Sequence, residues 1–302
     1  MTRVGVFMNL AKDDPEAKAR ITGLQEGLEA LGHTGLQIEC RYGAGTEEIL
    51  RKNAKELVDL APDVIHAASG TMLDALQNEM QQAGRTIPIV FAGVIDPVGT
   101  GKIASLAKPG GHATGCGSIK FSIGAKWLAL LKIVVPGLTR AVVVGDLGAD
   151  SGRGQLNSAE SGAKTLGVKL RPVDVNDASE IERAIGSFAD QADCGLIVTA
   201  ASAAAAIRRR IIALAARHKL PAVHPNRMYA TDGGLIAYGP ITVELYRSAA
   251  GYVDRILKGA KPADLPAQLT AKYELDVNLQ TARAMGLNVP AALLLFADRV
   301  IE

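Results

Sequence analysis

The sequence predicts an α/β protein made of two similar lobes, and three observations lead to this fold class. The first is a short apolar run over residues 64–67, which ends in Ser69, Gly70 and Thr71 where an amphipathic segment begins. An apolar strand, a tight turn and a capped helix start are typical of a strand buried in a parallel sheet. The second observation is that the same pattern returns over residues 193–206.

The third observation is that the flanking segments of the two halves match in order. The matched strands are residues 3–9 with 140–146, 36–41 with 169–174, and 86–91 with 219–224. Helical patterns lie between them in both halves. Two tandem βαβαβαβ units imply two Rossmann-like lobes, each a parallel sheet covered by helices.

Composition agrees with a globular protein of two domains. The chain has 302 residues, 48% of them hydrophobic, and a formal net charge of +2. This charge is too small to indicate a nucleic-acid partner, which usually meets a clustered basic face. No apolar run approaches the roughly 20 residues of a membrane span.

The sequence contains no pattern for a metal, a cofactor or catalysis. Cys40, Cys116 and Cys194 stand far apart, without a CxxC pair or metal-ligand spacing, so we expect buried thiols. The motifs for dinucleotides, nucleotide phosphates, zinc and a serine nucleophile are absent. We therefore expect a binding protein with no cofactor and no catalytic residues.

Candidate ligand contacts in the first half stand at the ends of predicted strands. The first elements are a strand over residues 3–9 ending at Asn9, a helix capped by Asp13 or Asp14, a strand over 36–42 and a helix capped by Thr46. Ser69, Gly70 and Thr71 offer backbone N–H groups, hydroxyls and the positive end of a helix to an anionic group. Thr71 could instead act only as the helix cap.

Asp96 and Pro97 end a later strand at the same sheet edge, because proline stops the ladder. We expect the Asp96 carboxylate to face the cleft, although it could also cap a turn or pair with a lysine. His66 lies inside a strand and Trp127 on an apolar helix face, so we expect a hydrogen-bonded core histidine and a core tryptophan.

Candidate contacts in the second half occupy corresponding turns. They are Ser202 in an alanine-rich turn, Asn226, Arg227 and Tyr229 after a strand, and Tyr238 before a Gly-Pro pair. Arg227 has an ion pair between the lobes as its alternative role, and Tyr238 has hinge packing. Asn9 has turn formation as its alternative.

The chain is expected to cross between the lobes three times, near Cys116, Gly239 and Thr270. Glycine-rich or proline-containing segments precede or surround these points. The predicted domains are residues 1–116 with 240–269, and residues 117–239 with 270–302.

Several long segments resemble the ABC-transporter substrate-binding proteins. They are RVGVFMNLAKDDPEA, TIPIVFAGVIDPVGTGKIASLAKPGGHATG, SIGAKWLALLK, GGLIAYGP, RILKGAKPADLP and the ending LQTARAMGLNVPAALLLFADRVIE. The resemblance implies a type I periplasmic-binding-protein fold, a solute held between two closing lobes, and a membrane permease as partner. No export signal precedes Val4, so the residues alone allow either a cytosolic protein or a processed or trimmed form. The resemblance implies a periplasmic location and therefore the processed or trimmed form.

By this resemblance, Ser69, Gly70 and Thr71 fall on the family's Ser-Gly-Thr turn and Asp96 on its Asp-Pro turn. The chain departs from the family at Met72, where relatives commonly have proline, and in the alanine-rich turn of the second half. Some relatives bind aromatic amino acids.

Three functional classes are consistent with the sequence. The leading one is a monomeric solute receptor of an ABC importer, and the others are the sensing domain of a regulator and an α/β enzyme acting between the lobes. No helix-turn-helix precedes Val4, which disfavours the regulator. We expect the ligand to be a small zwitterion, an amino acid with an aromatic or bulky apolar side chain, because a helix start and a carboxylate share one sheet edge.

Overall fold

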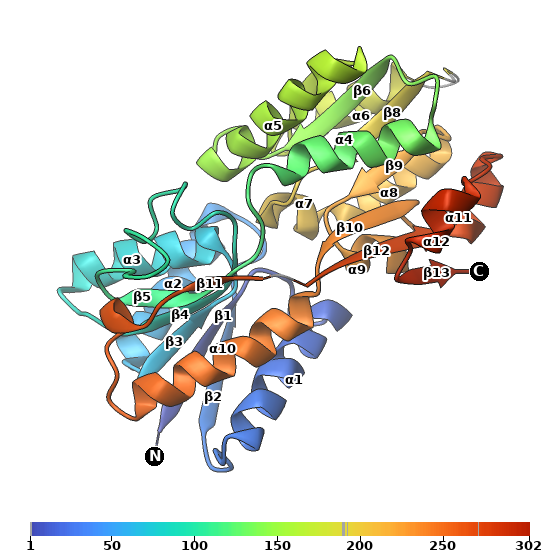
Figure 1. The fold of residues 1–302 in the computed structure, drawn as a ribbon. Helices are drawn as coiled ribbons and strands as arrows, with labels where there is room; N and C mark the ends of the chain where they lie inside the picture. The colour runs from blue at the N-terminus through green and yellow to red at the C-terminus, as the bar shows by residue number, and fades with distance from the viewer. Residues whose placement is uncertain (1, 189–190, 192, 271) are drawn as a thin grey trace. The chain divides into compact units, whose positions relative to one another are not determined.

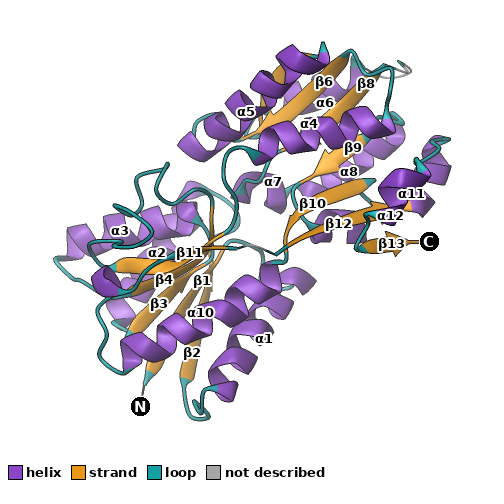
Figure 2. Cartoon of the chain, viewed as in Figure 1, coloured by secondary structure: helices purple, strands orange, loops and turns teal. Residues whose placement is uncertain are grey.

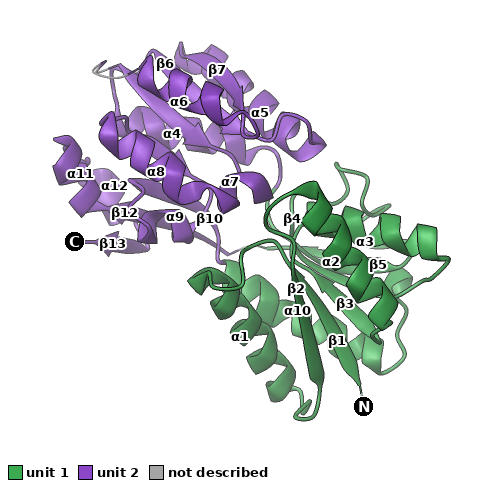
Figure 3. Ribbon diagram, turned by 180° about the vertical axis from the view of Figure 1, so that it is seen from behind, with its two compact units in different colours: residues 1–119, 242–271 green, residues 120–241, 272–302 purple. Residues whose placement is uncertain are grey.

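The protein consists of two compact α/β units, so the predicted fold class is confirmed (Figures 1 and 3). The computed structural model describes residues 2–188, 191, 193–270 and 272–302. Unit 1 comprises residues 1–119 and 242–271, and unit 2 comprises residues 120–241 and 272–302. The expected division differs from this one by no more than three residues at each point.

Unit 1 is a parallel sheet between two layers of helices. In its described residues the strand order is β11-β5-β4-β3-β1-β2. The strands are β1 (Arg3–Met8), β2 (Gln37–Tyr42), β3 (Val64–Ala67), β4 (Ile89–Val94), β5 (Ala113–Gly117) and β11 (Gln268–Leu269). The helices are α1 (Pro15–Ala30), α2 (Glu47–Leu60), α3 (Gly70–Ala83), α10 (Thr242–Leu257) and a 3-10 turn at Pro262–Asp264.

The helices of unit 1 cover both faces of its sheet. Helices α1 and α10 pack together on one face, and α2 and α3 pack together on the other (Figure 2). The predicted caps are confirmed at Asp14, whose Oδ1 accepts from Glu16 N at 3.0 Å, and at Thr46. All β3 side chains are buried, as a strand covered on both faces requires.

Unit 2 repeats this plan and adds strands at one side. In its described residues the strand order is β13-β12-β10-β9-β8-β6-β7. The strands are β6 (Arg140–Gly145), β7 (Lys169–Asp174), β8 (Cys194–Val198), β9 (Ala222–His224), β10 (Ile236–Pro240), β12 (Tyr273–Asn278) and β13 (Arg299–Ile301). The helices are α4 (Ile123–Val134), α5 (Asp150–Leu166), α6 (Ala178–Gly186), α7 (Ser202–Ala206), α8 (Arg208–Arg217), α9 (Arg227–Thr231), α11 (Leu279–Met285) and α12 (Ala291–Leu295).

One strand of unit 2 corrects the prediction of purely parallel sheets. Strand β12 runs antiparallel to β10, with Pro240 opposite Tyr273 and Ile236 opposite Val277. The chain leaves unit 2 at the end of β10 and returns at the start of β12, so both points lie at one edge of the sheet. A strand that re-enters at the edge where its neighbour ended must run in the opposite direction.

The buried residues agree with most expectations for the core. Trp127 has no exposed surface, and its Nε1 donates to the carbonyl oxygen of Tyr238 at 2.8 Å. Cys116 and Cys194 are buried, and burial raises the pKa of each thiol to about 11. Cys40 is only half-buried, which corrects the expectation for that thiol. The helices of the described chain are too short or too polar to span a membrane.

Candidate functional site

The start of α3 lies at the carboxyl edge of the unit 1 sheet. Ser69 is the helix cap: its Oγ accepts a hydrogen bond from Met72 N at 3.4 Å, and the helix begins at Gly70. Thr71 is the second residue of the helix and is exposed, so it is not the cap. The first turn of α3 therefore presents backbone N–H groups and an accessible hydroxyl at this edge.

Asp96 shapes the turn that follows β4, the neighbour of β3 in the sheet. Its backbone is left-handed, with φ of 39°, and its Oδ1 accepts from Gly99 N at 3.0 Å. Its carbonyl oxygen accepts from Thr100 N at 2.8 Å. The alternative role as a turn cap is thus observed. The side chain remains half-buried at the sheet edge rather than enclosed.

The loop after Asp96 brings a cation to the start of α3. Lys102 Nζ forms an ion pair with Asp74 of α3, so the lysine pairs with this residue rather than with Asp96. A Cβ placed on Gly70 would lie 4.0 Å from the Cε atom of Lys102. Lys102 was not among the predicted contacts, although its place in the loop after the Asp-Pro turn was a usable signal.

Asn9, at the end of β1, accepts a hydrogen bond from a buried arginine. Its Oδ1 accepts from Arg20 Nη1 at 3.4 Å. Arg20 is 5% exposed, pairs with Glu16 at 2.9 Å and lies over the ring of Tyr246. Asn9 is itself buried, so the observed contacts agree with its alternative role in the turn.

In unit 2, Arg227 begins α9 directly after β9 and is anchored to β12. It forms ion pairs with Glu274 and, at 3.7 Å between Nε and Oδ1, with Asp276. Both partners belong to unit 2, so the expectation of an ion pair between the lobes is wrong for these contacts. Burial raises the pKa of Asp276, which has no exposed surface, and Arg227 opposes this shift. Asn226 precedes this arginine, and its buried Oδ1 accepts no hydrogen bond within the described part of the chain.

The two candidate tyrosines of unit 2 have different environments. Tyr229 has no exposed surface and stacks on His224 with ring centroids 5.0 Å apart, which places it in the core. Tyr238 is half-buried and stacks on Tyr273 at 5.8 Å, with Lys126 Nζ 5.9 Å from its ring centroid. Of the two rings, only that of Tyr238 is accessible.

The turn after β8 is fixed by a residue that the sequence analysis missed. Ala200 N donates to Gln155 Oε1 at 2.9 Å, and Gln155 Nε2 donates to Ala200 O at 3.1 Å and to Ser151 O at 2.8 Å. Gln155 lies on α5 and has no exposed surface. Ser202 follows as the first residue of α7 and is half-buried. A signal in the sequence would have been a glutamine on the buried stripe of an amphipathic helix.

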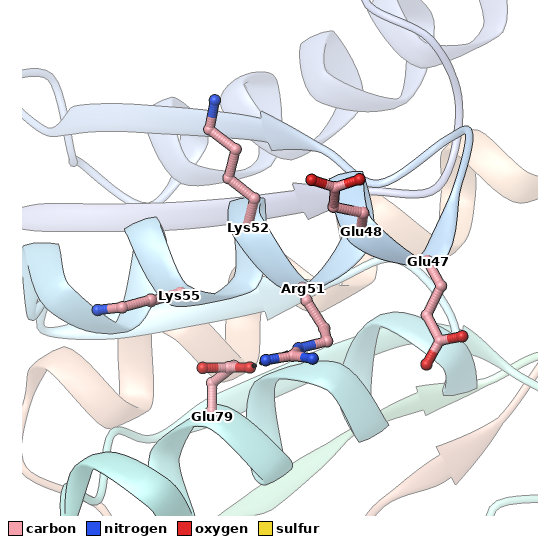
Figure 4. Close-up of a pocket in the computed structure, with 6 residues that line it drawn as sticks. All are labelled: Glu47, Glu48, Arg51, Lys52, Lys55 and Glu79. Carbon is pink, nitrogen blue, oxygen red and sulfur yellow. Dashed lines mark ion pairs between the residues drawn. The ribbon is translucent and has the colours of Figure 1, made fainter.

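A hollow of about 580 Å³ lies on the helices of unit 1. Charged residues of α2 and α3 line it: Glu47, Glu48, Arg51, Lys52, Lys55 and Glu79. Figure 4 shows that Arg51 points toward Glu79, whereas Lys52, Lys55 and Glu47 point in different directions. The ion pair between Arg51 and Glu79 measures 3.7 Å. The side chains do not converge on one point, so this hollow does not form a recognition site.

No group of three or more histidine, cysteine, aspartate or glutamate residues in the described chain could hold a metal ion.

Two α/β units that each carry turns at the carboxyl edge of a sheet have the architecture of a two-lobed binding protein. The chain belongs to the family described as ABC transporter substrate binding protein, which it matches over residues 4–301. This is a family of binding proteins rather than of enzymes, and the protein is a solute-binding protein of an ABC transporter.

Three relatives illustrate the range of this similarity. The tyrosine-binding protein of Clostridioides difficile (strain R20291) is 26% identical over 268 residues, which are 88% of this chain and 76% of that protein. An ABC domain from Streptococcus pneumonia, solved in complex with L-Trp, has a TM-score of 0.88 at 21% identity, with 99% of each chain covered. A solute-binding protein from Agrobacterium vitis, bound with alpha-D-tagatopyranose, has a TM-score of 0.66 at 16% identity and covers 98% of this chain and 99% of its own. The last two show the type I periplasmic-binding-protein fold.

Proposed function

We propose that the protein binds an amino acid with an aromatic or bulky apolar side chain, closes its two units on it and delivers it to the membrane permease of an ABC importer. The main observation behind this proposal is that the positive end of a helix and a carboxylate lie at the same edge of the unit 1 sheet. The N-terminus of α3 lies there, and so does the half-buried carboxylate of Asp96, in the turn after β4, the strand next to β3.

These two groups suit the two ends of a zwitterion. The N–H groups of Gly70 and Thr71, together with the positive end of α3, favour the carboxylate of the ligand. Lys102 also lies beside this helix start, but its ammonium is paired with Asp74, so the positive potential comes from the helix itself. Asp96 uses one carboxylate oxygen in its turn, and the other is the partner for the ammonium group. A neutral sugar needs neither charge.

The relatives support an amino acid more than a sugar, because the tyrosine-binding protein and the L-Trp complex both bind aromatic amino acids. In this proposal, unit 2 receives the side chain. Ser202, Asn226, Arg227 and Tyr238 are its candidate contacts, and the Tyr238 ring flanks the apolar part of the ligand. The protein acts in the periplasm as a monomer.

The substitution Asp96→Asn tests the proposed ammonium site by removing charge while keeping shape. Asparagine tolerates a left-handed backbone, and its Oδ1 can still accept from Gly99 N, so the turn survives. We expect affinity for L-tyrosine or L-tryptophan to fall by about 1.5 to 3 kcal/mol, the value of a hydrogen bond to a charged group. Isothermal calorimetry measures this loss.

Asp63→Asn is the matched control, because Asp63 also accepts a backbone N–H, from Arg3 at 2.8 Å, but stands at the amino edge of the unit 1 sheet, where β1 and β3 begin. The affinity of this control variant should equal that of the unsubstituted protein.

Thr71→Ala, the second test, should weaken binding through loss of the exposed hydroxyl. Unchanged affinity in both Asp96→Asn and Thr71→Ala would move the site elsewhere, and tight binding of D-tagatose instead of amino acids would reject the proposed ligand class.

A further inference from the structure

In the turn after β8, a single side chain from a neighbouring helix occupies the backbone of one residue. Gln155 accepts from Ala200 N and donates to Ala200 O, at 2.9 and 3.1 Å. One side chain therefore satisfies both hydrogen-bonding groups of this residue. Thr199, just before it, donates from its backbone N to Val144 O at 2.9 Å and is 1% exposed.

Close packing keeps Gln155 in this position. A Cβ on Gly124 of α4 would lie 2.1 Å from Gln155 O, and a Cβ on Gly152 would lie 1.7 Å from Asp146 O. Real Cβ atoms do not approach backbone this closely, so α4, α5 and the end of β6 meet only because these positions are glycine. The backbone that carries Gln155 has little room to move.

Apart from the Ser202 hydroxyl, the side chains of the resulting surface are apolar. The half-exposed residues of the turn and of the first part of α7 are Ala200, Ala201, Ser202 and Ala203. Three of these four contribute only methyl groups as side chains, and the backbone of the first is occupied by Gln155. A ligand hydroxyl placed against Ala200 would lose its hydrogen bonds to water without finding a replacement there, whereas an apolar side chain would lose none.

We propose that Gln155 is a positioning residue that sets the class of solute, because it makes the β8 turn of unit 2 an apolar wall. This inference rests on the proposed function, in which the ligand lies at the carboxyl edges of the sheets. It adds that discrimination between apolar amino acids and polyhydroxylated solutes comes from a buried amide that does not touch the ligand.

The test replaces Gln155 by methionine, which is unbranched like glutamine but cannot form these hydrogen bonds. Calorimetry with L-tryptophan and L-serine measures binding to the full chain. We expect affinity for L-tryptophan to fall by about tenfold. Affinity for L-serine should change by less than about threefold, because its short side chain does not depend on the wall. A role in stability alone would weaken both ligands equally.

The substitution Asn278→Leu is the matched control. Asn278 is 4% exposed, and its amide donates to Ala230 O at 3.1 Å and accepts from Thr281 N at 3.0 Å. It lies in the same unit, at the opposite end of the sheet, where Val277 pairs with the first residue of β10. The variant should lower the melting temperature as Gln155→Met does, but should keep the preference for L-tryptophan.

Hydrogen exchange at the Ala200 amide tests the same contact without a ligand. Exchange should be slow in the unsubstituted protein and at least about tenfold faster in Gln155→Met. Unchanged exchange, equal losses for L-tryptophan and L-serine, or full retention of L-tryptophan affinity would each overturn the inference but leave the amino-acid proposal standing. Preferential binding of D-tagatose by the unsubstituted protein would overturn both.

Discussion

At the scale of single residues, each unit contains a buried histidine without hydrogen bonds from its ring. The ring of His66 of β3 packs at a tilt against Tyr246, with centroids 4.6 Å apart, and that of His224 of β9 stacks on Tyr229. None of the four ring nitrogens has a hydrogen-bond partner in the part of the chain that the structure describes. The expectation of a hydrogen-bonded His66 is therefore wrong, because aromatic packing takes the place of a polar partner.

Burial of these rings should make the protein sensitive to acid. Burial lowers the pKa of His66 to about 4 and that of His224 to about 3, from 6.5. Below pH 6.5 the unfolded chain takes up protons that the folded chain does not. With respect to these two histidines, the free energy of unfolding is therefore at its maximum above pH 6.5. It falls as pH drops from 6.5 toward 4, by about 1.4 kcal/mol per pH unit for each histidine.

Urea unfolding at pH 7, 6 and 5 measures this slope. His66→Phe should reduce it by one histidine's share, because phenylalanine keeps an aromatic ring and does not titrate. Tyr246→Phe is the control: it keeps the aromatic ring beside His66, and burial raises the pKa of Tyr246 to about 12, outside this range. The same slope in His66→Phe as in the unsubstituted protein would contradict the assignment.

At the scale of elements, local signals in the sequence predicted where helices begin and whether a segment is a helix or a strand better than they predicted the direction of a strand in its sheet. Thr46 and Asp14 cap helices as expected, because an N-cap depends on residues within one turn of the chain. The direction of β12 was missed. Its antiparallel pairing follows from where the chain re-enters unit 2, which no local pattern records. Strand β13, three residues long at the end of the chain, was missed because so short a run has no periodicity.

Two glycines in helices should respond in opposite ways to the same substitution. In α4, Gly124→Ala would place a methyl 2.1 Å from Gln155 O, so α4 and α5 must separate, and we expect a loss of about 1–3 kcal/mol or more. In α10, Gly251 has open space where a Cβ would lie, and Gly251→Ala should stabilise the helix by up to about 1 kcal/mol. Thermal unfolding of both variants gives the comparison. Stabilisation by Gly124→Ala would refute the close approach of α4 and α5.

At the scale of the whole molecule, the sequence located turns but not the contacts that fix them. Ser69 and Asp96 could be assigned to one sheet edge because the carboxyl ends of neighbouring parallel strands meet there. The ion pair between Lys102 and Asp74 joins residues 28 positions apart in the sequence. The hydrogen bonds between Gln155 and Ala200 join residues 45 positions apart. Such contacts depend on how loops and helices pack, and a single sequence carries no periodic signal for them.

The connections between the two units predict a motion of the whole chain. The chain passes from one unit to the other after residues 119, 241 and 271, and short connections of this kind act as hinges in two-lobed proteins. A ligand shifts such an equilibrium only by its difference in affinity for the two states. In our proposal that difference is large, because the closed state alone lets the ligand touch the α3 start in unit 1 and the Ala200 turn in unit 2.

We therefore expect the radius of gyration from small-angle scattering to fall when a verified amino-acid ligand saturates the protein. Gln155→Met and Asp96→Asn each weaken the contacts to one unit, so both should need more ligand for the same compaction. A solute that binds one unit only would leave the scattering unchanged. Unchanged scattering with a tightly bound amino acid would show that recognition does not require closure and that the two sheet edges do not share the ligand.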